Sequence, residues 1–478
     1  MNRTPRPANC LALVALMALG ACSMAPKYVQ PAQPVPASWP TGDAYLAQNE
    51  AGLPVVSYAE IFRDPRLRTL IEEALTNNRD LRVAAANIVA ARAQVRVTRA
   101  DQLPAIDASG SATDRETGGG FGLNGWSYAL SGGISSFELD LFGKLASATA
   151  VERNAALSTE AAARTVRLGL VADIAQAWAG YAADSELLRI AEDTAANAQD
   201  SVRLSEARLK GGIAARTELR QAQLVLETAK SDLANQKTAL AQDINALRLL
   251  VGAEIDPALL PASITDVNNG LGEVPAGTDT RVLLRRPDVL EAEYNLRAAN
   301  ADIGVARAEL FPTISLSALI GLASTSLSDL FKSASETTTL GGDASWSIFN
   351  GGAKTANVTM AKAQRDAMLA TYEKAIQTAF SEVADALADQ GTLAERLRSA
   401  QAYTEASRDN ANLVEATYKR GIASSLDNLD AQRSLYTARR SEIAVRLALA
   451  SNRITLYRVL GGDQATLPRP DEKAAQPN

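Results

Sequence analysis

Few side chains in this sequence are suited to covalent or acid–base chemistry. The chain has no histidine, so it lacks the commonest general base and metal ligand. Gly143-Lys144-Leu145 is not a phosphate-binding loop, because the upstream glycine spacing and the following Ser or Thr are missing. No glycine-flanked serine has the pattern of a nucleophile elbow. The residues predict no enzyme, no cofactor and no metal site.

Cys22 is the exception, because its surroundings predict a covalent modification. An apolar run from Leu11 to Leu19 follows two arginines and precedes Gly-Ala-Cys22, which is the layout of a secretory signal peptide. Leu19-Gly-Ala-Cys22 also resembles the bacterial lipobox, in which the cysteine is acylated and becomes the first mature residue. The alternative is an ordinary signal peptide with an incidental cysteine. Cys10 lies in the discarded segment, so the mature chain is expected to have no disulfide.

The remaining sequence contains two copies of one long unit. Residues 203–215 align without a gap with residues 412–424, which places Gly212 opposite Gly421 at an offset of 209. Upstream the match continues at an offset of 208, for example Pro104 with Pro312. A duplicated unit of this length suggests a pseudo-symmetric assembly in which each copy supplies an equivalent part of a ring or tube.

Each copy combines helices with short strands. Apolar residues recur every seven positions from Leu67 to Val95 and from Val289 to Leu310, which indicates long helices packed as coiled coils. Segments 105–142 and 313–349 interrupt them with alternating apolar and small polar residues, the weak pattern of transmembrane β-strands. Four strands cannot close a barrel, and an open edge in lipid leaves backbone groups unpaired. Several protomers are therefore expected to share one barrel.

The overall charge argues against one class of partner. The net charge of −6 is composed of both signs and shows no basic footprint, so nucleic acid is not an expected partner. No segment after Leu19 reads as a membrane-spanning helix.

Motifs along essentially the whole chain resemble the TolC/OprM-type outer membrane factors, in particular the lipoprotein branch of resistance-nodulation-division efflux systems. The motifs are the following: Cys22, Tyr28-Val-Gln-Pro, Trp39-Pro40, Phe62-Arg-Asp-Pro-Arg-Leu67, Arg285-Arg-Pro-Asp288, Glu309-Leu-Phe-Pro312, Trp346-Ser-Ile-Phe-Asn-Gly-Gly352 and Leu429-Asp-Ala-Gln-Arg433. Their order and spacing are more specific than any one of them.

The resemblance implies an α+β membrane protein: a homotrimer with a twelve-stranded outer membrane β-barrel continued by a periplasmic α-helical coiled-coil barrel. It implies a passive exit duct for drugs or other small molecules, which works with a periplasmic adaptor and an inner membrane pump. Most of the mass would lie in the periplasm of a Gram-negative bacterium, anchored to outer membrane lipid through Cys22.

On this reading the chain divides into six parts. These are a signal peptide (1–21), a proline-rich lipid-anchored segment of an equatorial domain (22–64), repeat 1 with hairpin 105–142 (65–254), an equatorial linker (255–280), repeat 2 with hairpin 313–349 (281–462) and a tail (463–478).

The resemblance also suggests a gate at the periplasmic tip. It assigns acidic gate residues to Asp427 and Asp430, a constricting apolar residue to Leu426, and hydrogen-bond or ion-pair partners to Tyr418 and Lys419. Asp427 and Asp430 share a helix face, and rings of three carboxylates are expected to raise their pKa values. Ser424 before Asp427 also fits a helix N-cap, and Asp430 also fits a solvated charge.

The glycine turns at the same tips have a structural and a functional interpretation. Gly211, Gly212 and Gly421 allow a left-handed turn between helices, and the family uses these tips to meet the adaptor. Two other functions stay open at this point: a duct for type I protein secretion, and a lipid-anchored coiled-coil scaffold without a pore.

Overall fold

The computed structural model describes residues 23–46, 57–116, 125–274, 277 and 279–463. Cys22 and the glycine-rich segment 117–124 lie outside these residues. The chain forms two compact units. One comprises residues 1–32, 87–160 and 291–372, and the other comprises residues 33–86, 161–290 and 373–478.

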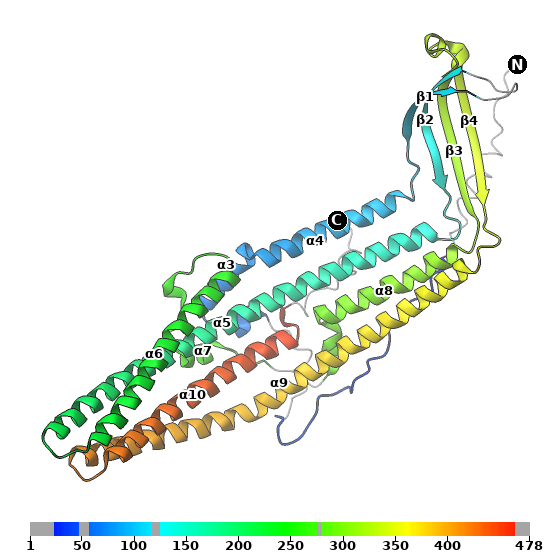
Figure 1. Ribbon diagram of the computed structural model, residues 1–478. Coiled ribbons are helices and arrows are strands. Elements are labelled where there is room, and N and C mark those ends of the chain that lie inside the picture. The colour runs from blue at the N-terminus through cyan, green and yellow to red at the C-terminus, as the bar shows by residue number, and fades with distance from the viewer. Residues whose placement is uncertain (1–22, 47–56, 117–124, 275–276, 278, 464–478) are drawn as a thin grey trace. The chain divides into compact units, whose positions relative to one another are not determined.

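The first unit contains a four-stranded antiparallel sheet in the order β1-β2-β3-β4. The strands are β1 (Asp107–Arg115), β2 (Gly125–Glu138), β3 (Thr313–Ser324) and β4 (Glu336–Ser345). The central pair joins the two copies of the repeat, because β2 lies beside β3 (Figure 1). In their register Leu130 is paired with Leu322. In the single chain β1 and β4 are exposed along their whole length, and each pairs on one side only.

Glycines let the two central strands approach closely. A Cβ atom built on Gly321 would lie 2.4 Å from the carbonyl oxygen of Leu130, and one on Gly133 would lie 2.2 Å from that of Ala318. Gly133 also has a φ of +143°, next to the irregular register between Ile134 and Phe137. Larger residues at these two positions would push β2 and β3 apart.

The helices show the duplication as matched pairs. Helices α4 (Arg79–Ala100) and α8 (Pro287–Ala308) have 22 residues each, and α5 (Lys144–Lys210) and α9 (Ala353–Lys419) have 67 each. Helices α6 (Arg216–Val251) and α10 (Ser425–Val459) have 36 and 35 residues. Within the second unit α6 returns beside α5, and α10 returns beside α9 (Figure 1). None of the described helices is long and apolar enough to cross a membrane.

Shorter elements lie between these helices and strands. They are α2 (Tyr58–Ile61), α3 (Pro65–Asn77), α7 (Ile264–Gly270) and the 3₁₀ turns η1 (Pro257–Leu259), η2 (Thr280–Arg285), η3 (Leu327–Asp329) and η4 (Ser333–Ser335). The range 255–280, predicted as an equatorial linker, includes the short helix α7. Ser263 caps α7 by accepting a hydrogen bond from the backbone of Asp266.

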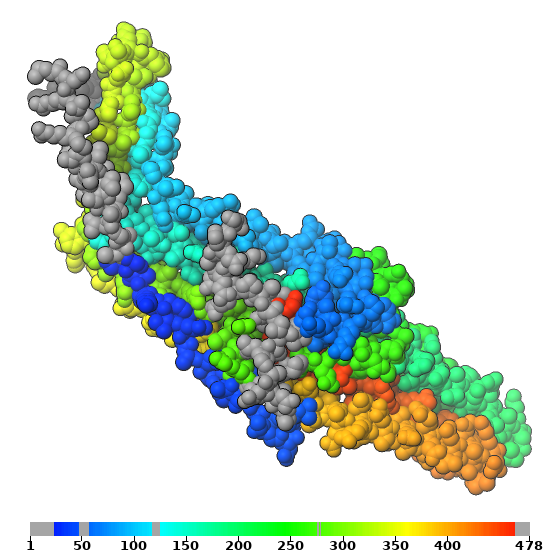
Figure 2. Space-filling view, turned by 180° about the vertical axis from the view of Figure 1, so that it is seen from behind, coloured from blue at the N-terminus to red at the C-terminus, as the bar shows by residue number. Residues whose placement is uncertain are grey.

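The N-terminal segment 23–46 lies on the helices as an extended strap (Figure 2). In the first unit, the carbonyl of Pro26 accepts a hydrogen bond from Asn300, and the Tyr28 hydroxyl donates to Glu293 at 3.3 Å. In the second unit, the Trp39 ring stacks on Phe380 with ring centres 5.4 Å apart. The described residues of this proline-rich segment therefore form an extended strap.

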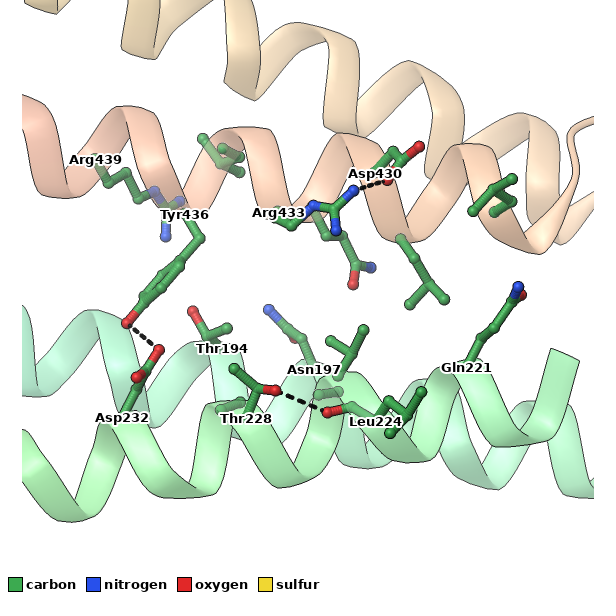
Figure 3. A pocket seen from close by; sticks show the side chains of 17 residues that line it. Thr194, Asn197, Gln221, Leu224, Thr228, Asp232, Asp430, Arg433, Tyr436 and Arg439 are labelled. Carbon is green, nitrogen blue, oxygen red and sulfur yellow. Dashed lines mark hydrogen bonds and ion pairs between the residues drawn. The ribbon is translucent and has the colours of Figure 1, made fainter. Parts of the chain in front are cut away.

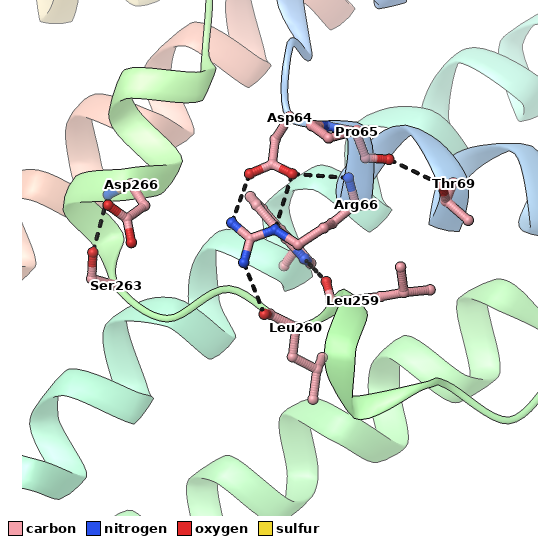
Figure 4. A network of polar contacts seen from close by, with 9 residues as sticks. Asp64, Pro65, Arg66, Thr69, Leu259, Leu260, Ser263 and Asp266 are labelled. Atoms are coloured by element: carbon pink, nitrogen blue, oxygen red, sulfur yellow. Dashed lines mark hydrogen bonds and ion pairs between the residues drawn. The ribbon is translucent and has the colours of Figure 1, made fainter.

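Two charge networks, one half-buried around Asp64 and one around the buried Arg286, fix helix starts in the second unit. Asp64 caps α3 and its carboxylate binds the Arg66 guanidinium, which also donates to the carbonyl of Leu260 (Figure 4). Arg286, 7 % exposed, forms ion pairs with Asp288 and Glu382, each at 2.7 Å. Its third donor reaches the carbonyl of Val459 in the last turn of α10. Both motifs noted in the sequence therefore have a structural role at a helix N-terminus.

Candidate functional site

The two long hairpins of the second unit turn in the same way. At the end of α5, the Gly212 N–H donates to Leu209 and the Ile213 N–H donates to Arg208. At the end of α9, the Gly421 N–H donates to Tyr418 and the Ile422 N–H donates to Thr417. Both patterns are Schellman motifs, in which the residue at C′ takes a left-handed conformation. Gly212 has a φ of +74° and Gly421 a φ of +79°, which explains why glycine stands at both positions.

Each turn presents one exposed apolar side chain. Ile213 is 71 % exposed and Ile422 is 76 % exposed, and the two positions correspond under the repeat offset of 209. Gly211, by contrast, is not in a left-handed conformation, and its place in the turn is set by a hydrogen bond from its N–H to the carbonyl of Ala207. The turns therefore form a pair of matched tips with an isoleucine on each.

Tyr418 connects the two hairpins just before the second turn. Its side chain is 5 % exposed, and its hydroxyl donates a hydrogen bond of 3.1 Å to the Glu218 carboxylate in the first turn of α6. The Arg208 guanidinium lies over the Tyr418 ring, 5.0 Å from its centre, and 4.0 Å from Glu218. Tyr418, Glu218 and Arg208 therefore connect the ends of α9, α6 and α5.

Asp427 completes a capping box with the N-cap residue Ser424 in the single chain. The Ser424 hydroxyl accepts a hydrogen bond from the Asp427 backbone N–H at 3.1 Å, and the Asp427 carboxylate accepts one from the Ser424 N–H at 3.1 Å. This is a complete capping box at the start of α10. Hydrogen bonds from Ser424 lower the pKa of the exposed Asp427 carboxyl. In the single chain this pKa is therefore lowered, whereas a ring of three carboxylates is expected to raise it.

The other predicted residues of this tip are exposed or paired locally. Asp430 forms an ion pair with Arg433 three residues later, and Lys419 forms one with Glu415 four residues earlier. Leu426 is 53 % exposed. Within one chain, Leu426 and the two aspartates lie on the first turns of α10, and Tyr418 and Lys419 lie on the last turn of α9.

Three residues of this site were not singled out from the sequence as functional. No sequence motif assigned a role to Glu218, and Arg208 and Arg433 were not expected as partners. The repeat could have pointed to Glu218. If the two equivalent hairpins pack side by side, the first turn of α6, which contains Glu218, must approach the end of α9. No comparable signal pointed to Arg208, because its contact depends on the direction of a long side chain.

Comparison with known proteins identifies the family of this chain. A family model described as "Outer membrane efflux protein" matches residues 70–253 and 280–462, one match in each copy of the repeat. The chain belongs to the outer membrane efflux protein family. The fold class predicted from the sequence, with two repeats and four strands in each protomer, is confirmed.

Relatives of this outer membrane efflux protein cover nearly its full length. The probable efflux pump outer membrane protein TtgC of Pseudomonas putida is 39 % identical over 93 % of either chain. The cation efflux system protein CusC of Escherichia coli is 38 % identical over 95 % of this chain and 99 % of CusC.

Solved structures of efflux channels share the fold. A crystal structure of CusC superposes with a TM-score of 0.82, at 38 % identity, covering 92 % of this chain and all of that one. The open state of the MtrE outer membrane channel of Neisseria gonorrhoeae also gives 0.82, at 31 % identity, covering 93 % and 99 %. This protein is therefore an outer membrane component of an efflux system.

Proposed function

We propose that this efflux protein is a passive exit duct that conducts drugs or other small molecules, and that three copies assemble to form it. The observation that supports the trimer most strongly is the sheet. Within the described residues, β1 and β4 each have one unpaired edge, and such edges are unfavourable in lipid. Pairing β1 of one protomer with β4 of the next satisfies both edges, and three protomers give twelve strands.

The duct is closed at rest near the helix tips. In the trimer, Leu426, Asp427 and Asp430 of three protomers surround the axis, and the bond between Tyr418 and Glu218 holds the α9–α10 hairpin to α6. Opening requires that the α9–α10 hairpin move away from α6, so the hydrogen bond is lost or rearranged. Lys419 has a local role, because it pairs with Glu415 on its own helix.

The matched tips are the docking surface for the adaptor. The exposed Ile213 and Ile422 offer apolar anchors at the ends of both hairpins, and glycine keeps each turn compact. The duct itself has no energy source, so an inner membrane pump of the resistance-nodulation-division class drives transport through this adaptor.

Cys22 anchors the protein by its acyl chains. The strap that follows Cys22 hydrogen-bonds to α8 through Asn300 and Glu293, so the chain next to the anchor is fixed on a helix from Pro26 onward. A Cys22→Ser variant is expected to lose incorporation of labelled palmitate, whereas the shared barrel should keep the variant in the outer membrane. Equal labelling of wild type and Cys22→Ser would contradict acylation at Cys22, and the absence of label from wild type would mean that the signal peptide is of the ordinary kind.

Cysteine cross-linking tests the shared barrel. Ser111→Cys on β1 and Thr338→Cys on β4 are combined in one chain and oxidised in intact cells, with Ser111→Cys alone as the control. Pairing between protomers predicts cross-linked dimers and trimers from the double variant and none from the single variant. The double variant is also tested for its ability to restore ethidium efflux to a strain that lacks its own outer membrane efflux protein. If it restores efflux but gives monomers alone, the shared barrel would be contradicted and the transport function would stand.

A further inference from the structure

A groove of about 410 Å³ separates α10 from the α5–α6 hairpin just beyond the helix tips. Its volume lies within the range of about 300–1,000 Å³ that is typical of small-molecule sites. Figure 3 shows α10 on one side and α5 and α6 on the other, with Gln221 near one end and Asp232 and Tyr436 at the opposite end. We will call this space the hairpin groove.

The surface of the hairpin groove is mainly apolar. Its floor includes Ala198, Ala229 and Leu429, which are 2 %, 5 % and 6 % exposed. The apolar residues of its walls are Leu224, Val225, Leu426 and Leu435. Leu224 lines the groove and is 69 % exposed in the single chain. An apolar molecule that enters the groove would remove this leucine from water.

The charges of the hairpin groove are arranged asymmetrically. Asp430 already has an ion-pair partner in Arg433. Asp232 accepts a hydrogen bond of 3.1 Å from the neutral Tyr436 hydroxyl, and within the described residues it has no ion-pair partner. Arg439 also lines this end but does not pair with Asp232. Asp232 is therefore a half-buried carboxylate that a cationic group could pair with.

We infer that the hairpin groove binds amphipathic organic cations of drug size. The apolar body of the molecule lies between Leu224 and Leu429, and its ammonium group pairs with Asp232. A bound molecule contacts α6 and α10 at once, so it favours the spacing at which Tyr418 also reaches Glu218. The binding claim stands independently of the proposed duct. A bound molecule should also favour the closed duct and so inhibit transport, and this second claim rests on the proposed function.

The binding test uses the full-length protein in detergent and the cationic dye rhodamine 6G, followed by fluorescence polarisation. Asp232→Asn is expected to weaken binding about tenfold, because an ion pair in a partly buried site is lost. Leu224→Trp is expected to weaken it similarly by filling the groove. The matched controls on α6 lie outside the groove: Glu227→Gln, a carboxylate paired with Lys230, and Leu249→Trp, which is 80 % exposed.

Three outcomes decide the inference. Selective weakening by the two groove variants supports it, and the anionic dye 8-anilinonaphthalene-1-sulfonate should then respond to Leu224→Trp but not to Asp232→Asn. Equal rhodamine 6G binding by the groove and control variants would overturn it, because the dye would then bind in the lumen or the detergent. Weakening by Leu224→Trp alone would overturn the cation preference.

The effect on the duct is tested separately by conductance. If binding follows the prediction but the dye does not inhibit conductance, the site stands and the proposed effect on the duct fails.

Discussion

The Tyr418 hydroxyl, near the end of α9, donates a 3.1 Å hydrogen bond to the Glu218 carboxylate in the first turn of α6. Each residue belongs to a different copy of the repeat, so this bond joins the two hairpins where their chains turn. Because Tyr418 is 5 % exposed, water cannot readily replace the bond.

Tyr418→Phe is therefore expected to favour the open duct. A hydrogen bond to a charged group contributes about 1.5–3 kcal/mol, so its loss shifts the balance between closed and open forms by roughly 10- to 150-fold. The measurement is the open probability in a planar bilayer. Glu218→Gln should have a similar effect, and the double variant should be less than additive. Tyr403→Phe, at a residue of α9 that is 50 % exposed, is the matched control and should behave as wild type.

Arg286→Met is expected to destabilise the second unit. The substitution removes a buried guanidinium that pairs with Asp288 and Glu382 and caps the carbonyl of Val459. Loss of one partner from a buried ion pair costs about 3–5 kcal/mol, and the partial exposure of both carboxylates places this case near the lower value. Thermal unfolding followed by circular dichroism measures the effect.

The control for Arg286 is a neighbouring ion pair on the surface. Arg281 pairs with Asp279, but its side chain is 77 % exposed, so Arg281→Met should leave the melting temperature nearly unchanged. Equal melting temperatures for the two variants would mean that the Arg286 network contributes no more than a surface pair.

Asp243→Asn is expected to change the pH dependence of stability. Burial and the neighbouring Asp184 carboxylate raise the pKa of Asp243 from 3.8 to about 7 in the folded protein. Between these two values the folded state binds more protons than the unfolded state, so stability falls as pH rises from about 4 to 7 and then levels off. Asp243→Asn cannot ionise at this position, so it lacks this pH-dependent loss of stability. The difference in melting temperature, variant minus wild type, should therefore be larger at pH 8 than at pH 5.

Asp409→Asn provides the comparison for this titration, because Asp409 is an exposed carboxylate on α9. It should melt in parallel with wild type at both pH values. A pH dependence that is the same for wild type and Asp243→Asn would show that Asp243 does not titrate in this range.

Gly321→Ala is expected to impair assembly of the sheet. The added methyl group would lie 2.4 Å from the Leu130 carbonyl oxygen, so β2 and β3 must separate, at a cost of about 1–3 kcal/mol. Heat-modifiable trimer bands on a gel should become weaker. Gly342→Ala on β4 adds the same methyl group with its nearest neighbour at 3.6 Å and should assemble normally. Equal assembly of both variants would contradict the close approach of β2 to β3.

Much of this architecture could be predicted because the sequence repeats it. The offset between Gly212 and Gly421 predicts two equivalent hairpins, and the break in the heptads predicts the strands between them. The short α7 was missed, since its seven residues carry no apolar period long enough to be recognised. The 2.7 Å bond from Arg286 to Glu382 was also missed, because residues 96 positions apart are brought together only by helix packing.

For the carboxylates at the tip, the sequence allows two roles. Ser424 and Asp427 are three residues apart, a spacing that suits both a capping box and a ring of charges. The single chain has the capping box, and a ring formed by three chains is compatible with it, since one carboxylate oxygen accepts both bonds from Ser424. Only a measurement on the assembled protein separates the two roles.

Single-channel conductance of the purified protein in a planar bilayer tests the closed duct most directly. Wild type is compared with the Asp427→Ala, Asp430→Ala double variant and with Ser424→Ala, which removes the cap but keeps both carboxylates. We predict low conductance for wild type and for Ser424→Ala, and a several-fold increase for the double variant. Equal conductance of all three proteins would contradict a gate formed by these carboxylates, and the absence of any channel from folded trimers would contradict the duct.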